Sequence, residues 1–466
     1  MAAKQPVPQV AALSWIRVRR RLLIAIALAV VLVAAVALVV AYHRVRHHRV
    51  KTVTGSTSTE FVTTAPPPPK KPPEPGVYWP TYGYDQERAR FDPGPKLRPP
   101  FRRVWTFHGR SLLEFPPVVG YGRVFITTFH GALYALSAET GKKVWRYKSP
   151  RCGWASPALD AHLVFETWIG NYECGSKLGD GEVAAFDEKT GKLRWRRLVG
   201  PTESSPLVAR HLVLLGDWNG RVWALDERTG KTRWTTDLNG AIKGSVALSG
   251  RRLYIGTYGG EVACIDVRNG HVLWTSTGHG SFYSSPAVAY GRVYIGSLNG
   301  GVYAFGASTG DLLWEQPTGG YVYASPAIWH RLVLIGSYDG SFYAFDAGTG
   351  SVRWRFPAGG EISGSASVVS GIVYFSTFTE RTFGLNAANG RVVKEWPDGK
   401  YSPVVADASH LYLVGLGRLY ALAKPHAPPP RRHRAARRAC ARCSKRAGRT
   451  AAHARRVVRR AKLHGR

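Results

Sequence analysis

Acidic residues, methionine and cysteine are scarce in this 466-residue chain. There are 30 Asp plus Glu against 64 Lys plus Arg, with five Cys and a single Met. No two cysteines are adjacent, and neither an HExxH motif nor a P-loop occurs. These absences argue against zinc hydrolases and phosphate-loop enzymes. A hydrophobic content of 44% nevertheless excludes a wholly disordered chain.

The excess of positive charge is concentrated at the two ends of the chain. Residues 1–60 contain nine Lys or Arg and one acid, and residues 424–466 contain sixteen Lys or Arg and no acid. The ends therefore carry +24 of the net charge of +34 and leave +10 for residues 61–423. Because this central part is only mildly basic, the overall charge says little about a folded site.

A long apolar run lies close to the amino terminus. Residues 22–42, which begin with Leu22 and end with Tyr42, carry no charge. A helix of this length would span the ~30 Å hydrocarbon layer of a membrane. We therefore predict a single transmembrane helix, preceded by a short basic segment in residues 1–21. A cleaved secretory signal is the alternative, because small residues of the cleavage type occur near its centre.

A spacer follows the apolar run. Residues 43–101 are rich in Thr, Ser and Pro, and residues 65–75 read APPPPKKPPEP, which is typical of a semi-rigid polyproline II segment. We expect residues 43–101 to form a stalk and lead-in that hold a folded body away from a membrane. Nearly equal numbers of Lys and Arg flank the apolar run, so the charges do not fix its orientation. The stalk and the cysteine pair described below favour an extracytoplasmic body.

The central part of the chain repeats with a period of about 40 residues. Between residues 105 and 394 the intervals of the repeat are 40, 50, 39, 40, 40, 40 and 40, and Lys394 takes the place of a Trp. Four short strands in each unit of this length indicate a β-propeller. The tryptophans that mark the repeat are Trp105, Trp145, Trp195, Trp234, Trp274, Trp314 and Trp354.

The repeat predicts an all-β fold, an eight-bladed β-propeller in residues 102–423. Seven units are complete, and an eighth that begins near Tyr401 lacks its last strand. The isolated strand around Trp105 can supply the missing strand. We therefore predict that the first strand of the domain pairs into the last blade and closes the ring, which removes exposed strand edges.

The units also resemble a known family. The pattern D-x-x-T-G-x-x-x-W in residues 226–234 and S-S-P-x-V-x-x-G-x-V-Y-I-G in residues 284–296 are similar to the repeats of pyrroloquinoline quinone (PQQ)-type propellers. The lead-in WPTYGYD at residues 79–85 is similar to the segment before the first blade of quinoprotein dehydrogenases. The resemblance implies that the repeat tryptophans pack between blades. The family includes calcium-dependent dehydrogenases and non-enzymatic scaffolds of outer-membrane protein assembly, and fold alone does not choose between them.

A dehydrogenase of this family would need a calcium site beneath the quinone, a catalytic Asp and usually two adjacent cysteines. Glu114 and Glu173 resemble its calcium ligands by position. However, Cys152, where the cysteine pair would begin, is followed by Gly153, and no segment resembles the one that carries the catalytic Asp. We therefore expect no catalytic residues and no cofactor. The alternative is an oxidoreductase that uses PQQ with Ca²⁺ near Glu114 and Glu173.

In a propeller, the loops that enter the innermost strands converge on one end of the central channel. The residue two positions before each Ser-Pro pair, or its equivalent, should therefore belong to a ring at this end. We interpret the ring as a candidate binding face for a protein or a glycan, because aromatic and charged side chains favour such contacts. The alternative is that these residues merely line the channel, as some residues must in any propeller. The ring consists of Glu114, Trp154, Glu203, Lys243, Tyr283, Tyr323, Ser363 and Lys400.

The cysteines and the basic tail add further expectations. Cys152 enters the second blade and Cys174 lies in an insert of that blade, and we predict a disulfide between them in an oxidising compartment. Residues 424–466 should be disordered and could bind a polyanion, although an unspecific charged extension is equally compatible with them. Nucleic acid would be a partner only if the tail were cytoplasmic. Cys440 and Cys443 could form a disulfide or bind zinc.

Together these observations predict a single-pass protein of the cell membrane whose extracytoplasmic propeller is a non-enzymatic binding or assembly scaffold of the cell envelope. Its partners would be the membrane, through residues 22–42, and an envelope protein or glycan at the propeller face. Two other functions stay open. One is the PQQ- and calcium-dependent oxidoreductase, and the other is a polyanion-tethering protein that binds through its tail.

Overall fold

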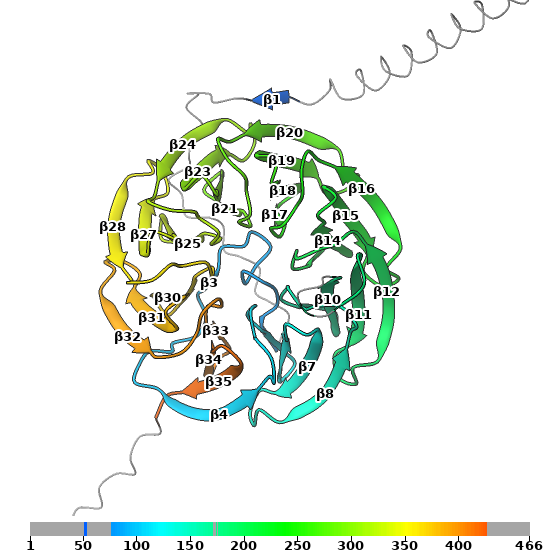
Figure 1. The fold of residues 1–466 in the computed structure, drawn as a ribbon, viewed down its shortest axis with the longest axis vertical. Helices are drawn as coiled ribbons and strands as arrows, with labels where there is room; N and C mark the ends of the chain where they lie inside the picture. Colours follow the sequence, from blue (N-terminus) through cyan, green and yellow to red (C-terminus); the bar gives the residue numbers. More distant parts are fainter. Residues whose placement is uncertain (1–50, 54–75, 171–173, 175, 426–466) are drawn as a thin grey trace, which may run out of the picture. The chain divides into compact units, whose positions relative to one another are not determined.

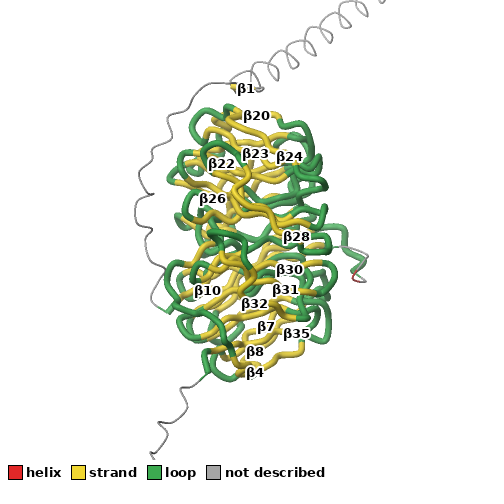
Figure 2. The backbone as a smooth tube through the Cα atoms, turned by 90° about the vertical axis from the view of Figure 1, so that its left-hand side faces the viewer, coloured by secondary structure: helices red, strands yellow, loops and turns green. Residues whose placement is uncertain are grey.

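The structure is a computed structural model that describes residues 51–53, 76–170, 174 and 176–425. Eight β-sheets surround a central channel and follow one another around the ring in chain order (Figure 1). Figure 2 shows the same ring from the side, with strands running between its two ends. The predicted all-β, eight-bladed propeller is therefore confirmed.

Each blade is an antiparallel sheet of four strands ordered from the channel to the rim. The first four blades contain β5 (Val118–Gly120), β6 (Arg123–Thr127), β7 (Ala132–Ser137) and β8 (Lys143–Lys148); β9 (Ala158–Asp160), β10 (Leu163–Ile169), β11 (Gly181–Asp187) and β12 (Leu193–Val199); β13 (Leu207–Ala209), β14 (Leu212–Gly216), β15 (Arg221–Asp226) and β16 (Thr232–Asp237); β17 (Ala247–Ser249), β18 (Arg252–Gly256), β19 (Glu261–Asp266) and β20 (Val272–Thr277).

The second half of the ring is built in the same way. Its blades contain β21 (Ala287–Ala289), β22 (Arg292–Gly296), β23 (Gly301–Gly306) and β24 (Leu312–Pro317); β25 (Ala327–Trp329), β26 (Leu332–Gly336), β27 (Ser341–Asp346) and β28 (Val352–Pro357); β29 (Ser367–Val369), β30 (Ile372–Thr377), β31 (Arg381–Asn386) and β32 (Val392–Trp396); β33 (Val405–Ala406), β34 (His410–Val414), β35 (Arg418–Ala423) and β4 (Arg102–His108). Three further strands add to these sheets, namely β1 (Lys51–Val53) beside β20, β2 (Val77–Trp79) beside β5 and β3 (Phe91–Asp92) beside β29.

The last blade is assembled from both ends of the domain. Strand β4 pairs antiparallel with β35, with Trp105 opposite Ala421 and Arg102 opposite Ala423. The predicted closure of the ring by the first strand is therefore confirmed. It pairs the edge that an incomplete eighth blade would expose.

The hydrophobic core is divided among the interfaces between neighbouring blades. All six residues of β23 are buried, because this middle strand has a blade packed against each of its two faces. The outer strand β28, by contrast, alternates exposed and half-buried residues. The valine- and tyrosine-rich strands of the repeat therefore supply the core, and the charged outer strands face solvent.

The tryptophans of the repeat connect each blade to the next. The indole N–H of Trp145 donates to the carbonyl of Glu188 in the following blade at 2.9 Å. Gly191, in the turn of that blade, has a φ of +71°, and an added Cβ would lie 2.6 Å from the Trp145 ring. The turn glycine is thus required both for its left-handed conformation and for contact with the indole. The same indole bond is made by Trp105, Trp195, Trp234, Trp274, Trp314 and Trp354.

The lead-in does not end outside the ring but enters it. Residues 76–98 cross the channel, as the blue trace at the centre of Figure 1 shows. Their carbonyl groups accept hydrogen bonds of 2.7–2.9 Å from the innermost strands of five blades. We call residues 76–98 the plug. The donors are the N–H groups of Leu159, Leu248, Val288, Ile328 and Val368.

Several predictions lie outside the described residues. They are the transmembrane helix at residues 22–42, the charged tail after residue 425, Glu173, and the pair Cys440 and Cys443. In the part of the chain that the structure describes, no helix has the length and apolarity needed to cross a membrane.

Candidate functional site

The two ends of the channel differ. Loops that lead into the innermost strands lie at one end, which we call the mouth, and the plug fills the channel behind them. A belt of serines separates the mouth from the plug. In this belt the backbone N–H of one serine donates to the hydroxyl oxygen of the serine in the next blade, at 2.8–3.0 Å. The order is Ser156, Ser205, Ser245, Ser285, Ser325 and Ser365. The plug is therefore the floor of the channel behind the mouth.

Two arginines of the plug form part of this floor. Arg88 is fully buried and donates to the carbonyl groups of Val246, at 2.8 Å, and Ser205, at 3.1 Å. The guanidinium of Arg90 stacks on the ring of Tyr82, 4.0 Å from its centroid. Burial lowers the pKa of Arg88 to about 9, and the neighbouring Arg90 contributes to this shift. The floor is thus positively charged and tightly bound to the blades.

A charged cluster lies on one side of the mouth. The ammonium of Lys243 is 3.1 Å from a carboxylate oxygen of Glu203, and the hydroxyl of Tyr283 donates to the other oxygen. Burial raises the pKa of Glu203, while Lys243 opposes this shift. Lys243 also lies over the ring of Trp218, 3.8 Å from its centroid. Three of the predicted ring residues, Glu203, Lys243 and Tyr283, therefore contact one another. The opposite charges of Glu203 and Lys243 neutralise each other beside aromatic rings.

The other side of the mouth is aromatic. Tyr283 contacts Tyr323 with ring centroids 5.1 Å apart, and Tyr323 contacts Tyr338 at 4.8 Å. The series continues from Tyr338 to Phe378 at 5.5 Å and from Phe378 to Tyr401 at 5.4 Å. We call these five residues the aromatic arc. Such a surface resembles the apolar centre of a binding interface more than a solvated rim.

Sequence reasoning missed three of the five residues of this arc, namely Tyr338, Phe378 and Tyr401. Tyr338 and Phe378 belong to a second ring, formed by the turns between the second and third strands of the blades. Their backbone N–H groups donate to the neighbouring mouth loops, which holds the two rings together. The spacing of 40 residues was a visible signal for this ring. Its members are Phe129, Trp218, Tyr258, Leu298, Tyr338 and Phe378.

The remaining predicted ring residues also lie at the mouth but make separate contacts. Trp154 stacks on Phe129 with centroids 6.1 Å apart. The ammonium of Lys400 lies 5.3 Å from the ring centroid of Phe378. Glu114 and Ser363 are half-buried in their loops. The predicted ring residues therefore occupy equivalent positions in the eight blades. Only Glu203, Lys243 and Tyr283 among them form one polar cluster.

The insert of the second blade is fastened beside the mouth. A disulfide joins Cys152 and Cys174, whose Cα atoms are 5.8 Å apart, and this is the pair expected from the sequence. Cys152 also bridges to Ile169 through two backbone hydrogen bonds. A cross-link across 22 positions restricts the unfolded chain by about 3 kcal/mol in the chain-entropy model. Cys264 is buried with a free thiol.

A buried acid lies beneath the same loops. Glu166 has no exposed surface, and it accepts hydrogen bonds from the Thr127 hydroxyl and from the backbone N–H of Thr167 at 3.0 Å. No cation is within ion-pair distance of it in the described part of the chain. Burial therefore raises the pKa of Glu166 well above its usual value.

Glu166→Gln should make the propeller more stable at high pH but not at low pH. Because the folded pKa lies above the unfolded pKa, the folded state binds the proton more tightly, and wild-type stability falls as the pH rises from the unfolded value through the folded value. Glutamine does not ionise, so the variant does not lose stability in this way as the pH rises. Urea unfolding should show little difference at pH 4 and a gain of about 1–3 kcal/mol at pH 8, where the wild-type carboxylate is buried without a counter-charge. The control is Glu139→Gln in an exposed turn. An equal effect at both pH values would contradict this account.

The described residues do not fit a calcium-bound quinone. No group of three or more His, Cys, Asp or Glu among them could hold a metal ion. Ca²⁺ takes six to eight oxygen ligands, whereas the Glu203 carboxylate at the mouth is already bound by Lys243 and Tyr283. Of the two proposed calcium ligands, Glu173 lies outside the described residues, and Glu114 belongs to no group of three or more His, Cys, Asp or Glu that could hold a metal ion.

Comparison with known proteins gives a family and two kinds of relative. A family model described as outer membrane protein assembly factor BamB matches residues 102–217 and 218–425. The 1-butanol dehydrogenase (cytochrome c) of Thauera butanivorans is 29% identical over 132 residues, which are 26% of this chain and 19% of that protein. Outer membrane protein assembly factor BamB of Bordetella pertussis is 26% identical over 132 residues, 28% of this chain and 31% of that protein. The chain thus matches less than a third of the length of either relative.

Among solved structures, BamB from Moraxella catarrhalis aligns with a TM-score of 0.59 at 17% identity and covers 70% of this chain and 100% of that chain. At this identity the likeness shows the fold alone. The names of the relatives include both an enzyme and an assembly factor. The choice between these functions therefore has to rest on the residues of the site.

Proposed function

Because this chain belongs to the family described as outer membrane protein assembly factor BamB, we propose that its propeller is a non-enzymatic scaffold that binds a partner polypeptide at the mouth. The observation that carries the proposal is the aromatic arc beside a neutralised Glu203–Lys243 pair. Tyrosine and tryptophan dominate the energetics of protein interfaces, whereas unpaired charges oppose burial there.

The closed floor supports binding rather than passage. Because the plug is hydrogen-bonded to seven blades, we expect a partner to approach the channel from the mouth. The rings of the arc are also held by neighbouring rings and loops, so little side-chain freedom is lost on binding. Tyr321, which is 57% exposed beside Tyr323, is the outermost aromatic contact of this surface.

We further propose that residues 22–42 anchor the scaffold in a cell membrane and that the propeller lies on the extracytoplasmic side. The uncharged run of 21 residues and the proline-rich spacer support the anchor. The Cys152–Cys174 disulfide supports an oxidising compartment.

A photoreactive residue at the mouth should capture this partner. Benzoylphenylalanine in place of Tyr321, in the full chain and in its own membranes, should give one adduct of defined mass. Adding Tyr323→Ala and Tyr338→Ala should lower its yield at least tenfold, since buried aromatic anchors contribute about 2 kcal/mol or more and tenfold corresponds to about 1.4 kcal/mol.

The control carries the same photoreactive residue at Val352, which is 52% exposed on the outer strand β28. It should give no such adduct. Equal capture at both positions would contradict a specific mouth. Titration of the purified chain with PQQ and Ca²⁺ tests the enzyme alternative, and stoichiometric uptake with alcohol-dependent dye reduction would replace the scaffold by an oxidoreductase.

A further inference from the structure

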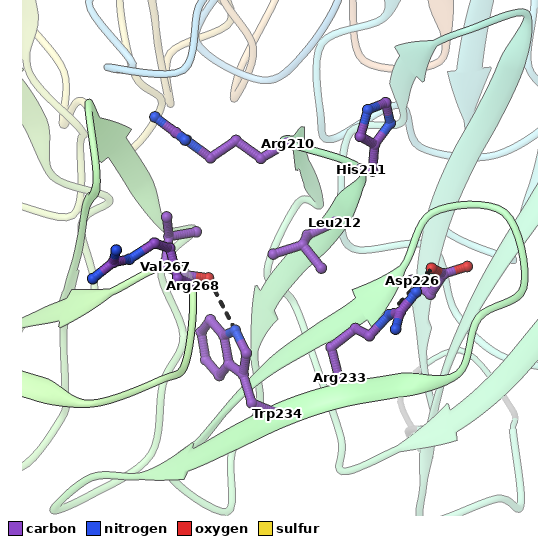
Figure 3. Close-up of a pocket in the computed structure, with 8 residues that line it drawn as sticks. All are labelled: Arg210, His211, Leu212, Asp226, Arg233, Trp234, Val267 and Arg268. Atoms are coloured by element: carbon purple, nitrogen blue, oxygen red, sulfur yellow. Dashed lines mark hydrogen bonds and ion pairs between the residues drawn. The ribbon is translucent and has the colours of Figure 1, made fainter.

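A cavity of about 340 Å³ lies far from the mouth, between the third and fourth blades. It is placed by the hairpin turn between β13 and β14, which is at the opposite end of these strands from the mouth loops. Figure 3 shows Leu212, Trp234 and Val267 around its centre and arginines at its edges. Its volume falls within the range of about 300–1,000 Å³ that is typical of small-ligand sites.

Two positions of the repeat that line this cavity hold short apolar residues. Between the first and second blades, the corresponding residues are Arg123 and Glu188, whose side chains form an ion pair across the gap. In the third and fourth blades these positions hold Leu212 and Val267, which do not bridge it. The indole of Trp234 is held in place by its hydrogen bond to the Val267 carbonyl at 2.9 Å. The apolar part of the wall, formed by Leu212, Trp234 and Val267, is therefore held in place.

The edges of the cavity carry an excess of positive charge. Arg233 pairs with Asp226 at 2.6 Å. Asp266 is shared by Arg251, at 3.0 Å, and Arg268, at 2.9 Å. The only other acid among these contacts, Glu227, is 3.3 Å from the Nδ1 of His211.

Arg210 is the cation at this edge that lacks an acidic partner among the described residues. Its Nη2 donates to the carbonyl of Gly250 at 2.9 Å, which leaves further N–H groups of the guanidinium for a ligand. The residues that line the cavity thus include three arginines, Arg210, Arg233 and Arg268, and one acid, Asp226. An anion with an apolar body complements both features.

We propose that this cavity binds an organic anion whose apolar body packs against Leu212 and Trp234 and whose acidic group faces Arg210. The site is separate from the mouth and does not depend on the proposed scaffold function. Guanidinium groups favour carboxylate and phosphate groups because of their paired N–H donors. The ligand class is therefore an amphiphilic or aromatic acid that is small enough for the cavity.

The proposal is tested with 2-naphthoate as the probe and the full chain in lipid nanodiscs. Isothermal titration should show binding to one site. Naphthalene-2-carboxamide, which has the same rings without the charge, and acetate, which has the charge without the rings, should each bind at least tenfold more weakly. Equal binding of the carboxamide would overturn the assignment of an anion site.

Two variants locate the binding. Arg210→Gln should weaken 2-naphthoate binding five- to tenfold, and Val267→Glu should abolish it, because the new carboxylate both enters the cavity and repels the probe. Arg331→Gln, in the corresponding exposed turn of the sixth blade, is the matched control and should change nothing. Since Arg210 is exposed, its replacement leaves the fold intact. Unchanged binding in both cavity variants would overturn the proposal, whereas loss of the mouth tyrosines should leave the probe bound.

Discussion

Replacing Arg88 by alanine is expected to lower the free energy of unfolding by about 3–5 kcal/mol. The guanidinium is fully buried and donates to the carbonyls of Val246, Ser205 and Tyr82, so it joins the plug to the third and fourth blades. Alanine would leave these carbonyls buried without a donor and would open a cavity on the channel axis. Urea unfolding followed by tryptophan fluorescence measures the change.

Arg98→Ala is the matched control for this variant. Arg98 also belongs to the plug and also donates to a backbone carbonyl, that of Ser370, but it is exposed to solvent. Its loss should cost less than about 1 kcal/mol, because water can replace the bond. If the two alanine variants were equally stable, the plug would be an accessory segment and not a structural part of the propeller.

Shortening the chain to end at residue 416 is expected to abolish cooperative unfolding of the propeller. This deletion removes β35, the only partner of β4 among the described strands, and therefore reopens the ring. The buried Leu419 and Leu422 are lost as well, which alone corresponds to about 2–5 kcal/mol for each side chain. The newly exposed edges of β4 and β34 should also promote aggregation.

A chain that ends at residue 425 is the control for this deletion. It lacks the basic tail but keeps every strand of the last blade. Its thermal midpoint should be the same as that of the full chain. By contrast, the shorter chain should show no cooperative thermal transition. A shared midpoint would mean that the pairing of β4 with β35 does not determine stability.

Much of the fold could be predicted because the same sequence pattern recurs along the chain. The GxxxW spacing marks one turn and one outer strand in six of the eight blades, and Trp105 without its glycine marked the strand that closes the ring. The plug could not be predicted in the same way. Residues 76–98 occur once, have no period, and acquire their partners from seven blades, most of them distant in the chain.

The position of the candidate site could be predicted from the sequence, but the full set of residues that form it could not. The ring of mouth residues followed from the Ser-Pro spacing, and the structure places all eight of them at the mouth loops. The contact between Lys243 and Glu203 is between residues 40 positions apart and could be anticipated from the ring. Tyr338 and Phe378 were overlooked because they belong to a different turn, whose convergence on the same end depends on strand direction.

The sequence by itself determined the number of blades, their order and the closing strand, since short-range spacing and apolar alternation are properties of the chain alone. Only the tertiary structure decided that the plug closes the channel, that Glu203 is neutralised by Lys243, and that a cavity opens between Leu212 and Val267. Each of these features depends on side chains or carbonyls from different blades, and their contacts arise when the ring forms. The physical reason is that packing across blades depends on the residues at both sides of each interface, which a repeat pattern leaves free to vary.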